Sequence, residues 1–355
     1  MISKFLVTLV VAIVALASTA CSDGDSATDG GGNSADGSGQ GDSSADASGQ
    51  DTGVANDASD GGDAAVAPDP ESLRVLNYNV MCSFCKNSDH PDWEQKWAAR
   101  VPWLRDVLAR HDADIIGTQE LQAFGLKEGD PDEFEQLLPP GYDNYYYRTK
   151  AGDTLDIDYP DAATAWRTSR FTGLESGEFW LSPTPDKAFS SGFGKGAQLP
   201  RLVVWVRLHD KLSDRDVIVV NTHFDNNSPS QEKSAPLFLE RLAPLAVKAP
   251  LIIVGDFNSR PNSVAYAKLV GGEPKLTDTY NEAVDKLDAT PENVVLTNVT
   301  PAPFWDVKDR IDHIYFNGGF SVQRWKVDLY RYGDKVQAPS DHPGAVVVDL
   351  HWPKP

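Results

Sequence analysis

Short apolar runs rich in valine and isoleucine recur from residue 71 onward and predict strands. In 73–80 (LRVLNYNV), Leu73 and Val75 alternate with Arg74 and Leu76, which is the two-residue period of a strand. Similar runs predict further strands at 112–120, 178–182, 201–208, 216–225, 251–258, 310–316 and 344–352. Most of the chain after residue 71 is therefore expected to form sheet.

Two segments show the period of amphipathic helices. In 101–112, Leu104, Val107 and Leu108 fall on one face, and Pro102 is tolerated if it lies in the first turn. The segment 228–248 is also largely helical in pattern. Each helix stands between two predicted strands, so the order strand, helix, strand occurs twice. This order predicts an α/β fold of two packed sheets with helices outside.

Residues 1–21 have the features of a signal peptide. Lys4 precedes an apolar run shorter than the ~20 residues that a transmembrane helix needs. The small residues 18–20 (STA) come directly before Cys21 and resemble a bacterial lipobox, in which this cysteine carries lipid. Serine replaces the usual leucine at the first lipobox position, so plain secretion is the alternative. Both interpretations predict export, and we favour a lipoprotein of the outer membrane or cell surface.

Residues 22–70 predict a disordered acidic tether. Serine, glycine, alanine and aspartate dominate this segment, and it has no lysine, arginine or aromatic residue. Such a composition buries too little apolar surface to offset the entropy of folding. Its eleven aspartates account for about half of the formal net charge of −20. The rest of the chain is acidic too, which argues against a stable nucleic-acid partner held through many phosphates.

The three cysteines agree with export. With Cys21 lipidated, Cys82 and Cys85 remain as a pair, and a local disulfide is one interpretation in an oxidising compartment. Zinc binding is disfavoured because no second cysteine or histidine pair follows at ligand spacing. A redox role is disfavoured because 87–91 does not begin like a helix. We interpret the pair as structural.

Polar residues stand at the ends of the predicted strands, where packing alone would favour apolar ones. They are Asn79, Gln119, Glu120, Asn221, His223, Asp225, Asp256, Asn258, Asp312, Asp341 and His342. A single aspartate at a strand end usually caps a turn or a helix. Together, however, they offer carboxylate and amide oxygens for a hard cation and two imidazoles for proton transfer.

Five of these motifs, QE, NTHFD, GDFN, RIDHIYF and SDH, resemble in this order the endonuclease/exonuclease/phosphatase superfamily, which has the fold of deoxyribonuclease I. The resemblance covers about 73–350 and implies one catalytic domain at 71–355, folded as a four-layer αββα sandwich. The stretch 176–193 (SGEFWLSPTPDKAFSSGF) is further similar to a bacterial branch of phosphatase-like members.

The resemblance also implies a metal site. Glu120 matches the principal Mg²⁺ ligand, Asn79 the amide beside it, and Asp341 a carboxylate next to the metal. Mn²⁺ is the expected substitute for Mg²⁺. Many nuclease members have an acidic residue where this chain has Met81, which leaves a second metal position open.

The same resemblance implies catalytic roles. Asp256 would activate or orient the attacking water, and Asn258 would contact the phosphate. His342 would stabilise developing charge while Asp312 orients it, and His223 would contact the phosphate or assist the leaving oxygen.

Three further residues carry expectations from the strand pattern. His313 should face away from the site because neighbours on a strand point to opposite faces. Arg201 is a candidate for binding substrate phosphate, with a structural role as the alternative. Trp180 and Trp205 are expected in the core.

Three functions remain open from sequence. The first is a metal-dependent phosphoesterase that hydrolyses a small or mid-sized phosphate mono- or diester. The second is a secreted nuclease of the same fold, whose DNA contacts would need basic loops that the acidic balance does not indicate. A loop expected near the substrate pocket at 145–161 replaces the Arg-Asp-Asp-Gly loop of related bacterial members, so their substrate does not carry over. The third is a non-catalytic surface binding domain. We favour a monomeric phosphoesterase whose partners are its phosphate-ester substrate and, through Cys21, the membrane.

Overall fold

The structure, a computed structural model, describes residues 69–87, 91–122, 132–153, 155, 158–194, 199–287 and 307–353. The predicted signal peptide at 1–21, with Cys21, and nearly all of the predicted tether at 22–70 lie outside the described residues. None of the helices in the described part of the chain is long and apolar enough to cross a membrane.

The strands form two mixed sheets. The seven-stranded sheet has the order β10-β12-β13-β1-β2-β4-β3. Its strands are β1 (Ser72–Asn79), β2 (Ile115–Gln119), β3 (Tyr142–Tyr147), β4 (Tyr159–Arg167), β10 (Asp285–Leu287), β12 (Ser321–Val327) and β13 (Val346–His351). The six-stranded sheet has the order β5-β6-β7-β8-β11-β9. Its strands are β5 (Phe171–Trp180), β6 (Leu202–Asp210), β7 (Arg215–His223), β8 (Leu251–Asp256), β9 (Thr277–Asp278) and β11 (Asp312–Asn317).

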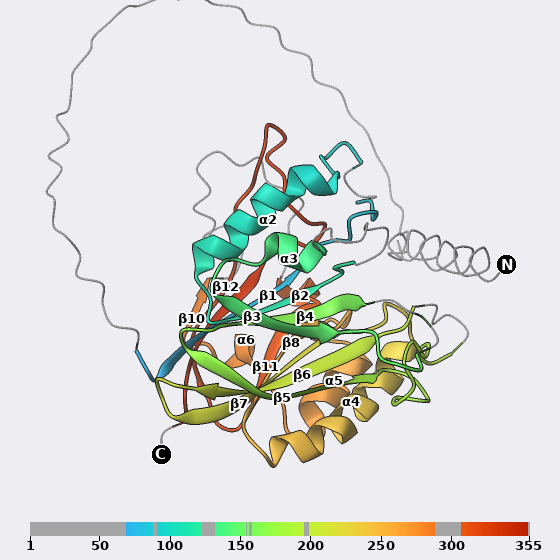
Figure 1. Cartoon of the computed structure of the whole chain (residues 1–355), viewed down its shortest axis with the longest axis vertical. Coiled ribbons are helices and arrows are strands. Elements are labelled where there is room, and N and C mark those ends of the chain that lie inside the picture. The colour runs from blue at the N-terminus through green and yellow to red at the C-terminus, as the bar shows by residue number, and fades with distance from the viewer. Residues whose placement is uncertain are drawn as a thin grey trace, which may run out of the picture. The chain divides into compact units, whose positions relative to one another are not determined.

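Helices cover the outer faces of the two sheets (Figure 1). They are α2 (Trp97–His111), α3 (Glu133–Leu137), α4 (Ser230–Ala246) and α5 (Val264–Gly271). The short α6 (Thr279–Glu282) instead contacts β11 of one sheet and β12 of the other, and a 3₁₀ turn lies at Val307–Asp309. In each half, a helix connects two parallel strands: α2 joins β1 to β2, and α4 joins β7 to β8. The predicted four-layer αββα sandwich is confirmed.

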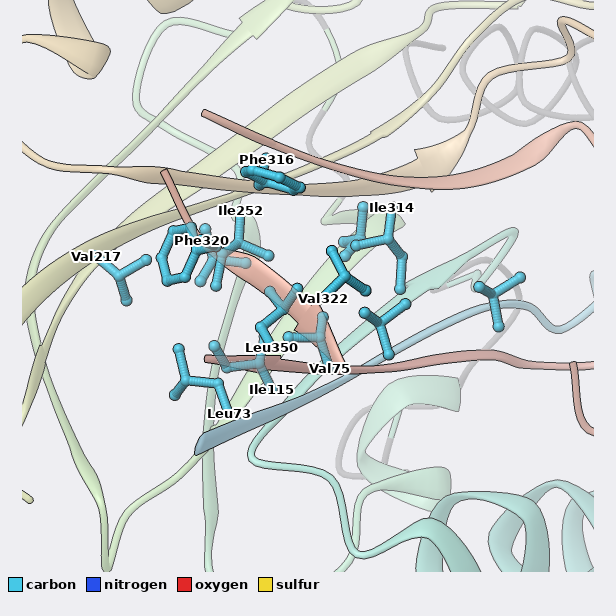
Figure 2. Close-up of a cluster of buried hydrophobic side chains, with 14 of the residues drawn as sticks. Leu73, Val75, Ile115, Val217, Ile252, Ile314, Phe316, Phe320, Val322 and Leu350 are labelled. Carbon is cyan, nitrogen blue, oxygen red and sulfur yellow. The ribbon is translucent and has the colours of Figure 1, made fainter. Parts of the chain in front are cut away.

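Three apolar layers follow from the alternation of the strands. Leu73 and Val75 of β1 face the other sheet and meet Ile252 and Ile314 there, in the cluster drawn in Figure 2. The next apolar residue of β1, Leu76, points to the outer face and packs in the cluster formed with α2 and α3. A corresponding outer cluster joins the second sheet to α4 and α5. The two-residue period of β1 therefore builds two cores at once.

The expected start of the first helix was wrong, and the expected bounds of one loop were too wide. Helix α2 begins at Trp97 and not at 101, so Pro102 lies in its second turn. The extra turn brings Arg100 into the protein interior, where its guanidinium is bound by backbone carbonyls. The loop expected at 145–161 is present but shorter, because its first three and last three residues belong to β3 and β4 and only the segment between Tyr147 and Tyr159 connects these strands. Its tyrosine-rich ends pack into sheet, which the polar composition concealed.

Trp180 lies in the core as expected, with 2% of its surface exposed. Trp205 is only partly buried and packs at the edge of the outer cluster, with the Lys248 ammonium 5.7 Å from its ring centroid. Cys82 and Cys85 form a disulfide, in agreement with the structural interpretation of the pair.

Gly117 of β2 lies where the two sheets approach each other closely. A Cβ atom there would lie 2.3 Å from Cγ2 of Val254 on the facing sheet. Gly117→Ala should therefore lower the free energy of unfolding by about 1–3 kcal/mol through overpacking. In a Val254→Ala background the same change should cost much less, because the clashing methyl group is gone.

Denaturant unfolding of the two single variants and the double variant measures this coupling. Gly271→Ala is the matched control, since a Cβ at that helical position meets no atom within 4 Å. An equal cost for Gly117→Ala in both backgrounds would contradict the assigned packing of the sheets.

Candidate active site

The predicted polar residues gather where strands of both sheets end. In the second sheet, β8 lies between β7 and β11. Asp256 at the end of β8 is the register partner of His223 at the end of β7 and of Asp312 at the start of β11. In the first sheet, β1 ends at Asn79, and β2 is followed directly by Glu120. Because the sheets pack face to face, these ends meet at one edge of the sandwich.

A buried amide network joins the two sheets beneath this edge. Gln119 Nε2 donates to Oδ1 of Asn77 at 2.8 Å and to Oδ1 of Asn221, on the other sheet, at 2.7 Å. Asn77 Nδ2 donates to the carbonyl of Gly255 at 3.1 Å. Gln119 and Asn221, grouped by sequence with the site, are thus fully buried supports. Losing one of these hydrogen bonds would leave a further buried amide group unpaired, beside Gln119 Oε1, which has no partner among the described residues, and would cost about 1–3 kcal/mol.

Asp256 lies at the centre of the site. Its Oδ2 accepts a hydrogen bond from Asn79 Nδ2 at 3.0 Å and lies 3.5 Å from Nε2 of both His223 and His342. Its Oδ1 accepts from the backbone N–H of Asn258 at 2.8 Å. The carboxylate is 1% exposed, so these neighbours fix its position closely.

Glu120 lies beside Asp256 and is held by two donors. Asn79 Nδ2 donates to its Oε1 at 2.9 Å, and the backbone N–H of Cys82 donates to its Oε2 at 3.1 Å. Asn79 was predicted among the metal ligands. Its nitrogen bonds both carboxylates and its oxygen accepts from the N–H of Met81 at 3.0 Å, so in this orientation it positions ligands.

Two site residues adopt the left-handed backbone conformation. Glu120 has φ 68° and Asn258 has φ 46°. Such a conformation costs about 1–3 kcal/mol for a residue other than glycine and persists only where surrounding contacts enforce it. At Asn258 these contacts include a bond from its Nδ2 to the carbonyl of Phe224 at 2.9 Å. The turn after β8 thereby directs Asn258 into the loop that follows His223.

His342 forms a tight pair with Asp312. Its Nδ1 lies 2.6 Å from Asp312 Oδ2. Burial alone would lower the pKa of His342, but the charge of Asp312, the hydrogen bond to it and the charges of Asp256 and Asp341 raise it well above the usual value. Burial also raises the pKa of Asp312. The shared proton stays on the imidazole, which is intrinsically the more basic group by about 2–3 pKa units.

His223 has a partner that the sequence did not reveal. Its Nδ1 lies 3.1 Å from Oδ1 of Asp161, in β4 of the other sheet, and 2.8 Å from Nη1 of Arg201. Arg201 is 5% exposed and its Nε has no partner among the described residues. Asp161 was hidden in the expected loop. The sequence held one indication that Asp161 is buried: it comes directly before the apolar run AATAW at 162–166.

His313 points away from the site, opposite to its neighbour Asp312. Its Nε2 lies 3.0 Å from the carbonyl of Ser259, and its ring stacks on Tyr315 with centroids 5.2 Å apart. It belongs to the outer face of the second sheet, as the strand alternation predicted.

The donor set fits a hard divalent cation. Two groups of residues each bring one ligand atom per residue within 4.8 Å of one another. The first group is Glu120, His223 and Asp256, and the second is Asp256, Asp312 and His342. Asp341 is nearby: although its surface is exposed, loss of hydration to the surrounding protein and then the charge of Glu120 raise its pKa to about 6. Carboxylates crowded together in this way are stabilised by a cation. Cys82 and Cys85 adjoin Glu120 but are joined in the disulfide, so they are not ligands.

Comparison with known proteins agrees with this geometry. The pattern that defines the Endonuclease/Exonuclease/phosphatase family matches residues 76–342. The structure of a mannosyl-6-phosphatase from Bacteroides thetaiotaomicron is similar, with a TM-score of 0.61 and 30% identity over 79% of this chain and 100% of that one. An endonuclease/exonuclease/phosphatase family protein from the same species gives a TM-score of 0.60 and 31% identity over 79% and 97%.

Curated relatives are more distant. The 3'-5'-exoribonuclease subunit Ccr4 of the CCR4-Not complex from Emericella nidulans is 25% identical over 329 residues, which cover 72% of this chain and 47% of that protein. Carbon catabolite repressor protein 4 homolog 2 of Arabidopsis thaliana is 26% identical over 269 residues, covering 65% and 42%. The chain spans about half or less of the length of these relatives.

The pairing of His342 with Asp312 predicts a pH dependence. Because the raised pKa keeps His342 protonated above neutral pH, loss of the proton from this imidazolium should make kcat fall on the alkaline side. Asp312→Asn removes the main cause of the raised pKa, so the alkaline limb should move to lower pH, and kcat should drop about 10²-fold or more. A pH–rate profile of both proteins measures this.

His313→Ala is the control, since it lies on the same strand and faces away. It should change stability at most and leave the profile in place. If His313→Ala shifts the alkaline limb while Asp312→Asn does not, the assignment of these neighbours is reversed.

Proposed function

The chain belongs to the endonuclease/exonuclease/phosphatase family of hydrolases acting on phosphoester bonds, and we propose that it is an exported, divalent-cation-dependent phosphatase of a small phosphate monoester such as a sugar phosphate. The observation that carries the proposal is the buried carboxylate of Asp256, which faces Nε2 of both His223 and His342 at 3.5 Å. A base and two imidazoles at one point suit the attack of water on an anionic ester.

The residues of the chain divide the work. Asp256 would accept the proton of the attacking water, since Asn79 and the N–H of Asn258 fix its orientation. His342, protonated and held by Asp312, would donate to a phosphoryl oxygen as negative charge develops.

On the other side of Asp256, His223 would hold the phosphate or protonate the leaving oxygen, and the buried Arg201 behind it would add positive charge. Asn258 would contact the phosphate. Glu120, whose carboxylate lies beside that of Asp256, would hold Mg²⁺ or Mn²⁺ together with Asp341, and the cation would supply charge neutralisation for the leaving oxygen.

Two observations support a small monoester over a nucleic acid. The formal charge of −20 opposes the binding of a polyanion. The mannosyl-6-phosphatase is matched over its whole length at 30% identity. A nuclease is the second candidate, and the identity of about 25% to the exoribonuclease subunit favours it. Neither candidate requires a second copy of the chain, and we propose a monomer.

A substrate panel tests the proposal. The purified protein should release inorganic phosphate from hexose 6-phosphates in Mg²⁺ and lose this activity in EDTA. Glu120→Gln removes a charge and little volume, so it should abolish turnover while the fold is kept. The control is Glu175→Gln, because Glu175 makes an exposed ion pair with Lys248. Cleavage of RNA or DNA oligonucleotides with no phosphate released from monoesters would establish the nuclease instead, and inactivity on every ester would favour a binding domain.

Export rests on the N-terminal sequence. We propose that Cys21 is lipidated and that 22–70 tethers the catalytic domain to the envelope, with plain secretion as the alternative. Labelled palmitate should enter the wild-type chain in cells and not Cys21→Ala, while a chain that begins at Ser72 should remain fully active on soluble substrates. Equal labelling of both proteins would reject Cys21 as the lipid site, and no labelling of either would favour secretion.

A further inference from the structure

Arg100 is a buried cation that bonds only to backbone. It is 1% exposed, and all five of its N–H groups have carbonyl acceptors. Nε donates to Gln95 at 3.2 Å; Nη1 donates to Val80 at 2.7 Å and Pro339 at 2.9 Å. Nη2 donates to Met81 at 2.9 Å and Cys82 at 3.1 Å. Among the described residues it forms no salt bridge, which is unusual for so deeply buried a charge.

Four of the five acceptors lie in two loops that adjoin candidate cation ligands of the first sheet. Three carbonyls belong to the 80–82 loop, which directly follows Asn79, and whose Cys82 N–H bonds Glu120. The fourth belongs to Pro339, directly before Ser340, Asp341 and His342. These loops lie some 260 positions apart in sequence, and one guanidinium joins them.

Ser340 provides a second connection between the same loops. Its Oγ donates to the carbonyl of Asn79 at 2.8 Å and accepts from the backbone N–H of His342 at 3.1 Å. We refer to the contacts of Arg100 and Ser340 with the two loops as the loop clamp.

The charge of Arg100 also acts on the site. Burial lowers the pKa of Arg100, and the negative charge of Asp341 opposes that shift. A cation placed behind Asp341 and Glu120 reduces the mutual repulsion of these carboxylates without occupying the position between them. Because it also repels a metal ion, its benefit to cation binding must come from the geometry that it imposes.

We propose that Arg100 is a positioning residue whose loop clamp holds Glu120 and Asp341 in the arrangement that binds the catalytic cation. This inference rests on the proposed function, because it assumes that the site binds a divalent cation. A purely stabilising role for Arg100 predicts a different result. Loss of the loop clamp should weaken cation binding even when the loss of folding free energy is taken into account.

Arg170 is a matched control in the same sheet sandwich. It is 3% exposed and lies at the opposite end of β1, where it donates to the carbonyl of Ser72. Its partners are the carboxylates of Asp114 and Asp210, and none belongs to the candidate site. Replacing it should destabilise the protein without touching the clamp.

The experiment measures Mn²⁺ binding to the purified full-length chain by electron paramagnetic resonance, with the melting temperature followed in parallel. Arg100→Lys keeps the charge but offers three donors for five acceptors, so the dissociation constant should rise about tenfold or more. Arg170→Lys should lower the melting temperature and leave Mn²⁺ binding unchanged. Ser340→Ala removes the second connection at little cost in volume and should weaken binding in the same direction.

The outcomes separate the two proposals. Absence of Mn²⁺ binding by the wild-type protein would refute the cation-dependent function itself. Normal binding by wild type, Arg100→Lys and Ser340→Ala would overturn the clamp alone, as would an equal loss in Arg100→Lys and Arg170→Lys. If Arg100→Lys fails to fold, Ser340→Ala decides, and unchanged Mn²⁺ affinity in that variant overturns the proposal.

Discussion

The site depends on hydrogen bonds that join the two sheets where their strands end. Gln119 reaches Asn77 on its own sheet and Asn221 on the facing one, and Asn77 reaches the carbonyl of Gly255. Gly255 is required there, since a Cβ would lie 2.5 Å from the carbonyl oxygen of Thr222. Apolar packing alone is non-directional and tolerates small slips between sheets. The directional hydrogen bonds of the amide network do not tolerate such slips. They fix the position of Asp256 relative to Asn79 and Glu120.

Above this network, like charges are concentrated at one edge of the sandwich. Asp256 and Asp312 are buried, Asp341 is exposed, and Glu120 adopts a strained backbone conformation beside them. Such a cluster would be unfavourable if its charges were unbalanced. Two imidazoles, the amide of Asn79, backbone N–H groups and the remote guanidinium of Arg100 offset part of the cost. A bound cation would relieve the repulsion that these groups leave uncompensated. The free energy that the chain loses by bringing the carboxylates together is therefore regained when the cation binds.

The sequence revealed those residues of the candidate site that interrupt or follow a local pattern. Asp256 and Asn258 break an apolar strand pattern at its end, and the period of two in RIDHIYF places His313 opposite Asp312. Sequence reasoning failed where a role depends on distant contacts. Asp161 and Arg100 serve partners 62 residues away in one case and 239 in the other. No local pattern encodes such a contact, because the fold must first bring the segments together.

The two imidazoles are equivalent in position but not in charge. Among the described residues, the charges that act on His342 are those of the carboxylates of Asp312, Asp256 and Asp341, so its pKa is raised well above the usual value and the protonated form is favoured. His223 lies between Asp161 and Arg201: with Nδ1 protonated it donates to Asp161, and with Nδ1 bare it accepts from Arg201. Arg201 therefore opposes the rise in pKa that Asp161 causes. A group balanced in this way can give up and regain a proton during turnover, whereas His342 is suited to constant charge stabilisation.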